Sequence, residues 1–512
     1  MKKFYYFNVL VIRKMSFLVL GLSLLTVSAM GQRIVQVPSN DELGNAILGD
    51  TLENGDRVDV NTIYELERDG LYPVAKEITL NSKLHIRAAE GTGLLPAIYA
   101  EKDESNNYPK IINTKGDVTL ENVYISNANG ADANPKWGGF RVGGTNSRVI
   151  LKGCQFEYDK ASTVQIRADS IKLYMTNCVA AKTGNYATYN GNGRLIDTRG
   201  YYVDSIVVQH VTVYYMQDRI IRNMGGEINY LEFNHITVVN NQGMHGVFAM
   251  AKVHHAKIVN NLVIDGEYGG DRLNSLEQTG PYPDNLHIYM ITMDTVYDDT
   301  QLEIHNNNFA FTPDLITFFD GNDTIWKPMV LAPLVAKTLG ADSVNAYFEE
   351  VVEFENMPAL PWDFLEAIYT NPQPEPMPNN WPDDIGISNI NASYADTYAS
   401  YTAAEGGIPL GDLNWFPEYM SVKEIQLISD MRVFPNPTTA YANVEFEMLE
   451  SSAVTLNVYS ITGQIISSAD AGLLHTGRQS IRLDVSHLQT GVYFCTVKSN
   501  GFSRTIKLFV AK

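Results

Sequence analysis

Cysteine and positive charge are both scarce in this chain. Only 3 of its 512 residues are cysteine, so disulfides do not form its framework as they do in small secreted domains. The chain has 38 basic and 58 acidic residues and a net charge of -20, which excludes general nucleic-acid binding. Its 45% apolar content supports a real core, and its length leaves room for two or three domains.

The N-terminus has the features of an export signal. Basic residues at positions 2, 3, 13 and 14 precede an apolar run at 17–27, and small residues follow at 28–32. With these flanks the apolar run is too short for a transmembrane helix, so no membrane-spanning segment is expected. We therefore predict a signal peptide over residues 1–31 and a protein that is exported.

One short pattern repeats through the middle of the chain. Residues 208–213, 233–238 and 259–264 are each β-branched, alternating segments with a polar residue just before the apolar run, which is typical of strands. Aligning His210, His235 and Asn261 gives steps of 25 and 26 residues. The pattern also occurs around Asn122, Gly153, Asn177 and Asn307, with steps of 31, 24, 33 and 46 residues, and we expect the last step to contain two turns.

A period in the mid-twenties, with short strands and no crossover helix, predicts a solenoid in which each turn covers the one below. The Leu-x-x-Leu-x-Leu framework of leucine-rich repeats is missing, so we predict a parallel β-helix. Recurring asparagines would form either a side-chain ladder along the axis or ordinary turns, and both remain open: Asn122, Asn177, Asn234, Asn260 and Asn307. Cys154 and Cys178 would stack about 4.8 Å apart, within disulfide reach, although buried, unpaired thiols are the expected state.

The entry to this region resembles that of a known family. A short helix predicted from Ser39 to about Leu48, a Gly-Asp turn, a strand ending in Tyr64-Glu65-Leu66 and the segment Leu84–Ala88 before Gly91 look like the start of pectate-lyase-like right-handed β-helices. The resemblance covers roughly residues 33–330. It implies an all-β fold over residues 32–325, a right-handed parallel β-helix with an N-terminal capping helix.

The period is lost in residues 326–430, which we predict to be an irregular segment that packs on the β-helix end, followed by a linker. A helix is expected at Ser343–Glu349, and a proline-rich stretch at 371–378 is expected to be extended. The segment Gly406–Pro417 is expected to pack on the C-terminal end of the solenoid.

From residue 431 to 512 the pattern changes to strands separated by turns every eight to twelve positions. This spacing predicts a small antiparallel β-sandwich. Phe434-Pro435-Asn436-Pro437, residues 458–464 and 488–494, and a basic last strand with Lys507 resemble the type IX secretion C-terminal sorting domain. This resemblance implies interaction with the type IX machinery, removal of the domain, and a final location at the cell surface or in the medium.

Positive charge is concentrated in the predicted solenoid. Residues 140–260 contain 13 basic and 8 acidic residues within a chain that is strongly acidic overall. Five of the basic residues precede the repeat marker by 9 to 13 positions and are expected to line one face: Arg141, Arg167, Arg199, Arg222 and Lys252. Stacked like charges repel, so either Asp197 and Asp218 or an elongated anionic ligand must offset them.

These residues predict a surface that binds polysaccharide, because arginine forks suit carboxylate or sulfate and aromatic faces suit sugar rings. The expected ligand-binding residues are Arg141, Arg167, Arg194, Arg199, Arg219 and Tyr215, with Tyr186, Tyr189, Tyr201, Tyr202 and Tyr214 around them. The alternative is that these are scattered, solvated charges on an ordinary β-helix exterior.

Two functions remain open: a binding or adhesion protein, and a polysaccharide lyase or glycoside hydrolase acting on an acidic glycan. For a lyase, Lys252, Arg222 and His245 would supply base, acid or proton shuttle and Arg199 would neutralise the uronate carboxylate. No metal site is predicted, because the dipeptide His254-His255 points to opposite faces of a strand and no aspartate cluster suits Ca²⁺. Ca²⁺ is the cofactor to expect only if the protein is a lyase. Binding is favoured because catalytic motifs are missing.

Overall fold

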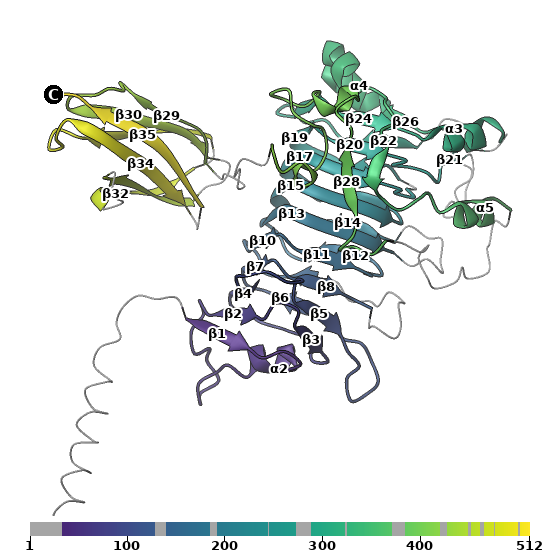
Figure 1. The fold of residues 1–512 in the computed structure, drawn as a ribbon, viewed down its shortest axis with the longest axis horizontal. Helices are drawn as coiled ribbons and strands as arrows, with labels where there is room; N and C mark the ends of the chain where they lie inside the picture. The colour runs from purple at the N-terminus through teal and green to yellow at the C-terminus, as the bar shows by residue number, and fades with distance from the viewer. Residues whose placement is uncertain are drawn as a thin grey trace, which may run out of the picture.

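The computed structural model of the protein is shown in Figure 1. It describes residues 33–128, 140–184, 192–243, 245–272, 288–322, 325–370, 385–419, 428–448, 452–460, 465–475, 477–499 and 502–512. The predicted signal peptide, the proline-rich stretch, Tyr186 and Tyr189 lie outside the described residues.

Parallel strands dominate residues 34–331, a region we call the parallel stack. Successive passages of the chain add strands to the same three faces, so strands distant in sequence become neighbours (Figure 1). The first face is formed by β1 (Ile34–Val37), β2 (Ile63–Leu66), β4 (Leu84–Ala88), β7 (Val118–Glu121), β10 (Arg148–Lys152), the first parts of β13 (Ile171–Thr183), β15 (Val203–Met216) and β17 (Glu227–Val239), then β19 (Lys252–Val259) and β23 (Gln301–His305).

The second face continues from the first through the long strands. It contains β3 (Leu71–Val74), β5 (Ala97–Ala100), β8 (Tyr124–Ser126), β11 (Gln155–Glu157), the later parts of β13, β15 and β17, then β20 (Leu262–Ile264) and β24 (Asn308–Ala310). The third face is a separate sheet of β6 (Ile112–Thr114), β9 (Phe140–Val142), β12 (Ser162–Ile166), β14 (Arg194–Asp197), β16 (Arg219–Arg222), β18 (Phe248–Ala249), β22 (Tyr289–Thr292) and β26 (Met329–Leu331).

From β7 onward, a single residue in the left-handed region bends each coil between the first and second faces. These residues have φ between 52° and 64° and recur once per coil: Asn122, Gly153, Asn177, His210, His235, Asn260 and Asn306. Asparagine and glycine tolerate this conformation better than most residues, which explains their recurrence in the sequence. The repeat predicted from sequence is therefore a repeat of this bend, with the last two markers one residue earlier than expected.

The 46-residue step contains one coil, which corrects the expectation of two. β19 pairs directly with β23 and β20 directly with β24, so no further coil lies between them. The additional residues of this step follow β20. They include β21 (Asp271–Arg272), which pairs antiparallel with the later strand β25 (Ile325–Trp326) outside the three faces.

In the described residues, asparagine side chains form ladders at the C-terminal coils. Asn260 Nδ2 donates to Asn234 Oδ1 at 3.0 Å, and Asn261 Nδ2 donates to Asn307 Oδ1 at 3.0 Å. Asn122 and Asn177 occupy bends that are separated by the Gly153 bend, so their side chains are not on neighbouring coils.

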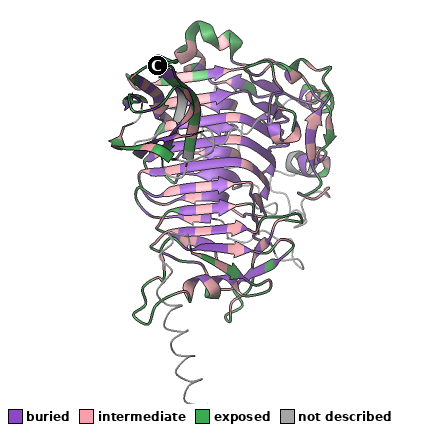
Figure 2. Ribbon diagram, turned by 60° about the vertical axis from the view of Figure 1, so that its left-hand side comes forward, coloured by how far each residue is buried: buried purple, intermediate pink, exposed green. Residues whose placement is uncertain are grey.

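Apolar side chains from all three faces fill the interior of the stack, as the buried residues in Figure 2 show. Cys154 and Cys178 stack within this core as free thiols, and the Cys154 N–H donates to Cys178 Sγ at 3.3 Å. The short helix α2 (Leu43–Leu48) lies at the N-terminal end (Figure 1), and the Glu42 carboxylate caps it by accepting from the Gly44 and Asn45 amides. The predicted capping helix is thus present, beginning later than Ser39.

Short helices occur between residues 313 and 370, after the last strands of the first and second faces. They are α3 (Pro313–Asp320), α4 (Pro333–Leu339), the 3₁₀ turn η1 (Gly340–Asn345) and α5 (Trp362–Thr370). The helix predicted at Ser343–Glu349 is wrong: the helical residues end at Asn345. α3, α4 and α5 each begin beside a proline or acidic residue but carry too few turns for a helical period to be visible in the sequence.

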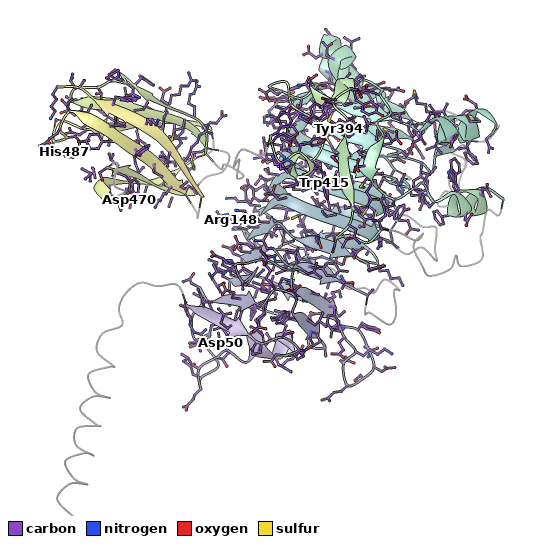
Figure 3. All side chains as sticks on the ribbon, viewed as in Figure 1. Asp50, Arg148, Tyr394, Trp415, Asp470 and His487 are labelled. Carbon is purple, nitrogen blue, oxygen red and sulfur yellow. The ribbon has the colours of Figure 1, made fainter. Side chains whose placement is uncertain are left out.

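Residues 404–416 run along the flank of the stack, where Tyr394 and Trp415 are labelled in Figure 3. This corrects the placement of Gly406–Pro417 on its end. The Gly411 amide donates to the Asn260 carbonyl at 2.9 Å, and Asp412 Oδ2 accepts from Thr212 Oγ1 at 2.8 Å. Gly411 has φ +81°, and a Cβ there would lie 2.4 Å from Thr237 Oγ1, so only glycine allows this approach. β27 (Phe354–Asn356), β28 (Asn391–Tyr394), η2 (Ala399–Tyr401) and η3 (Leu413–Trp415) complete the region.

Residues 428–510 form the predicted antiparallel sandwich. One sheet contains β29 (Ile428–Phe434), β30 (Tyr441–Met448) and β33 (Gly477–Asp484); the other contains β32 (Ile465–Leu474), β31 (Ser452–Tyr459), β34 (Gly491–Ser499) and β35 (Phe502–Val510). Alternate residues of these strands, such as Val444 and Phe446 of β30, are buried in a core separate from that of the stack.

The buried Asp412 predicts a pH-dependent stability. Burial raises the pKa of Asp412 to about 7, despite hydrogen bonds from Asn414 and Thr212 that favour the charged form. Between roughly pH 4 and pH 7 the folded chain therefore retains a proton that the unfolded chain has lost, so the free energy of unfolding falls as pH rises through this window. Asp412→Asn resembles the neutral acid and does not titrate, so its stability relative to wild type should increase from pH 4 to 7, by up to roughly 4 kcal/mol.

Calorimetric melting across this pH range measures the difference, with the exposed Asp342→Asn as control. A gap between Asp412→Asn and wild type that does not change with pH would contradict the assignment.

Candidate functional site

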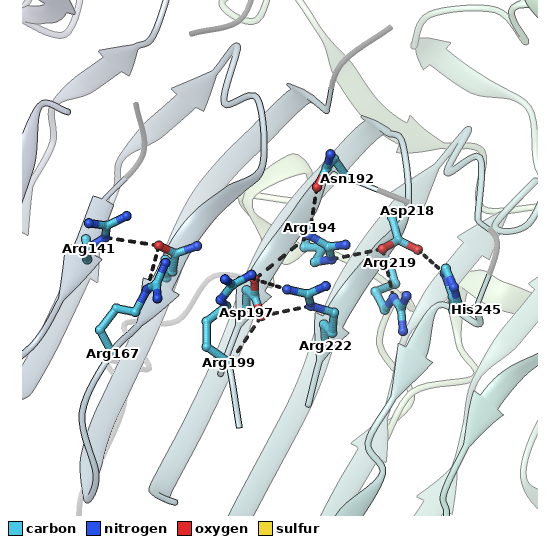
Figure 4. A network of polar contacts seen from close by, with 11 residues as sticks. Arg141, Arg167, Asn192, Arg194, Asp197, Arg199, Asp218, Arg219, Arg222 and His245 are labelled. Carbon is cyan, nitrogen blue, oxygen red and sulfur yellow. Dashed lines mark hydrogen bonds and ion pairs between the residues drawn. The ribbon is translucent and has the colours of Figure 1, made fainter. Parts of the chain in front are cut away.

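The third face brings most of the predicted basic residues together. One register column runs through Asn113, Arg141, Gln165, Asp197 and Arg222, each paired with the next across neighbouring strands. Each arginine of this column thus has an acceptor as a neighbour, and further arginines approach the same acceptors from the side (Figure 4). Arg194 and Arg219 stand directly opposite each other on neighbouring strands, where like charges repel, and both donate to Asp218.

At the Gln165 position two arginines share one neutral acceptor. Arg141 Nε donates to Gln165 Oε1 at 3.1 Å, and Arg167 Nε donates to the same oxygen at 3.0 Å. In the part of the chain that the structure describes, no carboxylate lies within ion-pair distance of either guanidinium. Burial, the charge of Arg167 and the charge of Arg199 lower the pKa of Arg141, while Glu77 opposes them.

Lys110, in the loop before β6, belongs to the same group. Burial and then the charges of Arg141 and Arg167 lower the pKa of Lys110, and Glu77 again opposes the shift. The Glu77 carboxylate itself accepts from Asn113 Nδ2 at 2.6 Å. Three cations therefore lie close enough to repel one another, with one acidic group nearby.

One coil further, a buried carboxylate replaces the neutral amide. Asp197 is fully buried and accepts from Arg222 through both oxygens, at 3.0 Å from Nε and 2.8 Å from Nη2. Arg199 approaches the same carboxylate at 3.7 Å and Arg194 at 4.0 Å. A fork from Arg222 onto a buried carboxylate fixes both partners strongly, so the protein itself neutralises Arg222 and offsets part of the charge of the other two arginines.

Asp218 forms the next centre along the face. Its Oδ2 accepts from Arg194 Nε and Arg219 Nε, both at 3.0 Å, and its Oδ1 lies 2.9 Å from His245 Nδ1. Burial alone would raise the pKa of Asp218, but the charges of Arg219, His245 and Arg194 outweigh it and lower the pKa to about 2. Asp218 is therefore ionised, and it orients a His245 ring that is 32% exposed.

Glu267 lies beside this centre and behaves in the opposite way. Burial raises the pKa of Glu267 well above its ordinary value, and the charge of Asp218 raises it further, against Arg219. Among described groups neither of its carboxyl oxygens has a hydrogen-bond partner, and the same is true of the buried Gln242 amide one coil earlier. Glu267 is thus a neutral acid behind the Asp218 centre, and no motif in the sequence pointed to it.

Seven predicted site residues share the third face or its flanking turns. They are Arg141, Arg167, Arg194, Arg199, Arg219, Arg222 and His245 (Figure 4). The arginines occupy three positions rather than the single column expected: Arg194 pairs with Arg219, Arg141 and Arg222 share the register column of Gln165 and Asp197, and Arg167 and Arg199 follow that column by two residues. The offset comes from loops of unequal length, which counting back from the repeat marker could not correct.

Lys252 and Tyr215 do not belong to this group. Lys252 begins β19 on the first face, opposite Glu227. Tyr215 ends β15 towards the second face, its ring is buried, and its hydroxyl donates to the Ala359 carbonyl at 2.6 Å. Tyr214 is likewise buried and Tyr201 packs against the core, whereas Tyr202 is 37% exposed. The expectation that Tyr215 offers a sugar-binding face is therefore wrong, because chain from residues 358–360 covers it.

In the described ranges we find no set of ligands for the Ca²⁺ that was expected if the protein is a lyase. Within them, no three His, Cys, Asp or Glu side chains group in a way that would hold a metal ion. His254 instead pairs with Asp299 at 2.9 Å and stacks on Tyr297. His210 and His235 stack on each other at the coil bend.

The acceptors Gln165 and Asp197 were missed as a pair, although a signal for them exists. Gln165-Ile166-Arg167 and Asp197-Thr198-Arg199 repeat the same spacing, an acceptor two residues before an arginine on the same side of the strand. With the register known, these triplets are recognisable as equivalent parts of one face.

Asp218 predicts a second dependence on pH. Its lowered pKa stabilises the fold above roughly pH 4, and this contribution is lost as pH falls towards 2. Asp218→Asn should destabilise the stack by about 3 to 5 kcal/mol near neutral pH, because the buried Arg194 loses its main counter-charge.

Urea unfolding measures this loss. The matched control is Asp204→Asn, whose carboxylate is half-buried and 3.7 Å from Lys172, and it should cost less than about 1 kcal/mol. Equal losses in the two variants would rule out a special contribution from Asp218.

Comparison with known proteins identifies the C-terminal region. Residues 432–511 match the family described as the secretion system C-terminal sorting domain, and no curated protein matches the chain. Among the described helices none has the length and apolar character needed to span a membrane. The sandwich at 428–510 is therefore a sorting domain, and the protein is exported by type IX secretion to the cell surface or the extracellular space.

Proposed function

We propose that this protein binds an acidic polysaccharide at the cell surface or outside the cell, through the cations of its third face. We further propose that the parallel stack is a right-handed β-helix similar to those of pectate-lyase-like proteins. The fold proposal is supported by the parallel pairing of three faces and by the recurring single-residue bend. An exported protein meets extracellular glycans, which gives such a surface a ligand.

The positive charge around Gln165 is the observation that carries the binding proposal. Burial and then the charges of Arg141 and Arg167 lower the pKa of Lys110, and burial and then the charge of Arg167 lower the pKa of Arg141. Among the described residues, the acceptor that the two arginines share is a neutral amide. An anion in front of these groups would relieve the repulsion, and arginine forks match carboxylate and sulfate oxygens.

The arrangement along the stack suits an elongated ligand. Arg141, Arg167, Arg199 and Arg222 lie on or directly after four successive third-face strands. Neighbouring strands are about 4.8 Å apart, so the charges form a line that crosses the strands. A chain with regularly spaced anions would contact several coils at once and gain affinity by multivalency.

Removing the two arginines that share Gln165 tests the proposal. The double variant Arg141→Gln/Arg167→Gln should lower the affinity for immobilised polyuronates and sulfated glycans at least tenfold, and should reduce the dependence of binding on salt. Retention of the secreted chain on glycan-coated surfaces measures both quantities.

The matched control is Lys76→Gln/Lys337→Gln, which removes the same charge from exposed positions elsewhere. If both double variants lose the same affinity, binding reflects net charge alone; if neither loses affinity, the third face is not the binding surface.

A polysaccharide lyase is the second candidate, supported by the contact between Asp218 and His245. The ionised Asp218 holds His245 Nδ1 at 2.9 Å, which favours the tautomer whose other nitrogen is basic. In β-elimination from a uronate, this base would take the C5 proton, the C4–O bond would break as the C4–C5 double bond forms, and the leaving oxygen would be protonated. Arg199 would neutralise the carboxylate, while Lys252 lies on another face and has no role in this version.

Unsaturated-uronate absorbance provides the test of this second candidate. Incubation with polyuronides should generate the signal, His245→Gln should abolish it, and His305→Gln on the first face should leave it unchanged. No signal with any polyuronide that the protein binds would leave only the binding function.

A further inference from the structure

We infer that Lys110, Arg141 and Arg167 around Gln165 form a subsite for a tetrahedral oxyanion, so that the bound glycan carries sulfate or phosphate ester groups. This inference rests on the proposed glycan-binding function and specifies its ligand. We call these four residues the Gln165 subsite.

The register between neighbouring coils shows what distinguishes this subsite. Gln165 stands directly opposite Asp197, at the same position of successive coils. Gln165 accepts hydrogen bonds from Arg141 and Arg167, whereas Asp197 accepts from Arg222 and lies 3.7 Å from the Arg199 guanidinium. Asp197 supplies a negative charge and Gln165 does not. The fold thus offsets part of the arginine charge at one coil and none of it through the equivalent side chain of the neighbouring coil.

The remaining donors of the subsite are available to an external group. Each guanidinium has five N–H donors, and Gln165 Oε1 occupies the Nε–H of Arg141 and of Arg167. Within the described chain, the terminal nitrogens of these two arginines make no further hydrogen bond. All three cationic side chains are only half-buried, so solvent and ligand reach them.

Three separate cations suit a tetrahedral group better than a carboxylate. A carboxylate presents two oxygens in one plane, a geometry that the fork of one arginine matches, as the Arg222 fork matches Asp197. A sulfate or phosphate ester presents three terminal oxygens in different directions. Lys110 comes from the loop before β6, Arg141 from β9 and Arg167 from the end of β12, so the donors originate on three successive coils.

The local charge agrees with this ligand class. Three cations act on one another here, and Glu77 is the acidic group that acts on both Lys110 and Arg141. The subsite therefore keeps a net charge of about +2. One carboxylate would compensate only part of this charge, whereas an oxyanion with more charge or more coordinating oxygens would compensate it better.

Two glycans of equal charge density distinguish the effect of the kind of anion on affinity from the effect of the number of charges. Chondroitin carries only carboxylates, and carboxyl-reduced chondroitin sulfate carries only sulfates, with one charge per disaccharide in each. Binding of the secreted full chain to both is measured at one ionic strength. The sulfate-only chain should bind at least tenfold more tightly, and inorganic sulfate should compete better than chloride at equal ionic strength. A phosphorylated mannan in a parallel arm shows whether phosphate esters are also accepted.

Variants assign any preference to the subsite. Lys110→Gln should reduce the ratio of the two affinities to within about twofold, whereas Arg199→Gln, which lies beside Asp197, should weaken both affinities and keep the ratio. Circular dichroism and melting temperature identify any variant that has failed to fold, and Arg167→Lys, which keeps the charge and loses the fork, then replaces it.

Equal or tighter binding of the carboxylate-only chain would overturn the inference and leave the proposed function intact. Binding of neither chain, nor of any other acidic glycan, would overturn both. A preference for sulfate that persists in Lys110→Gln and Arg167→Lys would place the sulfate site elsewhere and so contradict the assignment to these residues.

Discussion

From β7 onward, each coil of the stack depends on one residue in the left-handed conformation where the chain turns from the first face to the second. Positive φ is costly for most residues, so asparagine, glycine and histidine occupy these bends: Asn122, Gly153, Asn177, His210, His235, Asn260 and Asn306. The bend keeps all coils in register, and backbone hydrogen bonds between them then follow. Once register is fixed, side chains at equivalent positions form columns along the axis.

Columns concentrate charge as well as apolar surface. Residues that are distant in sequence come within about 4.8 Å of one another, which rewards apolar or amide stacking and penalises like charges. The protein relieves this penalty by placing Asp197 and Asp218, both fully buried, among its arginines. Where the acceptor is the neutral Gln165, this side chain does not offset the repulsion between the arginines. An external anion would therefore bind most favourably at this position. The proposed function therefore follows from one register position filled by an amide instead of a carboxylate.

Other parts of the chain cover the stack and direct its export. The N-terminal end is covered by α2, and the flank over β15, β17 and β20 is covered by residues 404–416, which bury Asp412. Two of the three cysteines are stacked in the core, where burial raises the pKa of Cys178 and keeps the thiols unreactive outside the cell. A separate sandwich with its own core carries the sorting signal. The proposed binding surface and the sorting domain thus lie in parts of the chain that form distinct cores.

The sequence alone determined the parts of this protein that depend on local pattern. Alternating β-branched segments, the recurring bend residues and the motifs of the last 80 residues indicated parallel strands, stacked coils and a sorting domain, because each depends on residues near one another in the chain. Only the tertiary structure decided which arginines are neutralised, since Gln165 meets Arg141 and Asp197 meets Arg222 through a register that loops of unequal length conceal. It also decided that Tyr215 is covered by residues near 359, that Lys252 lies on another face, and that Glu267 remains a neutral acid beside Asp218. The burial and charge pairing of these residues depend on neighbours that are tens to hundreds of residues away in the sequence, so local sequence patterns do not determine them.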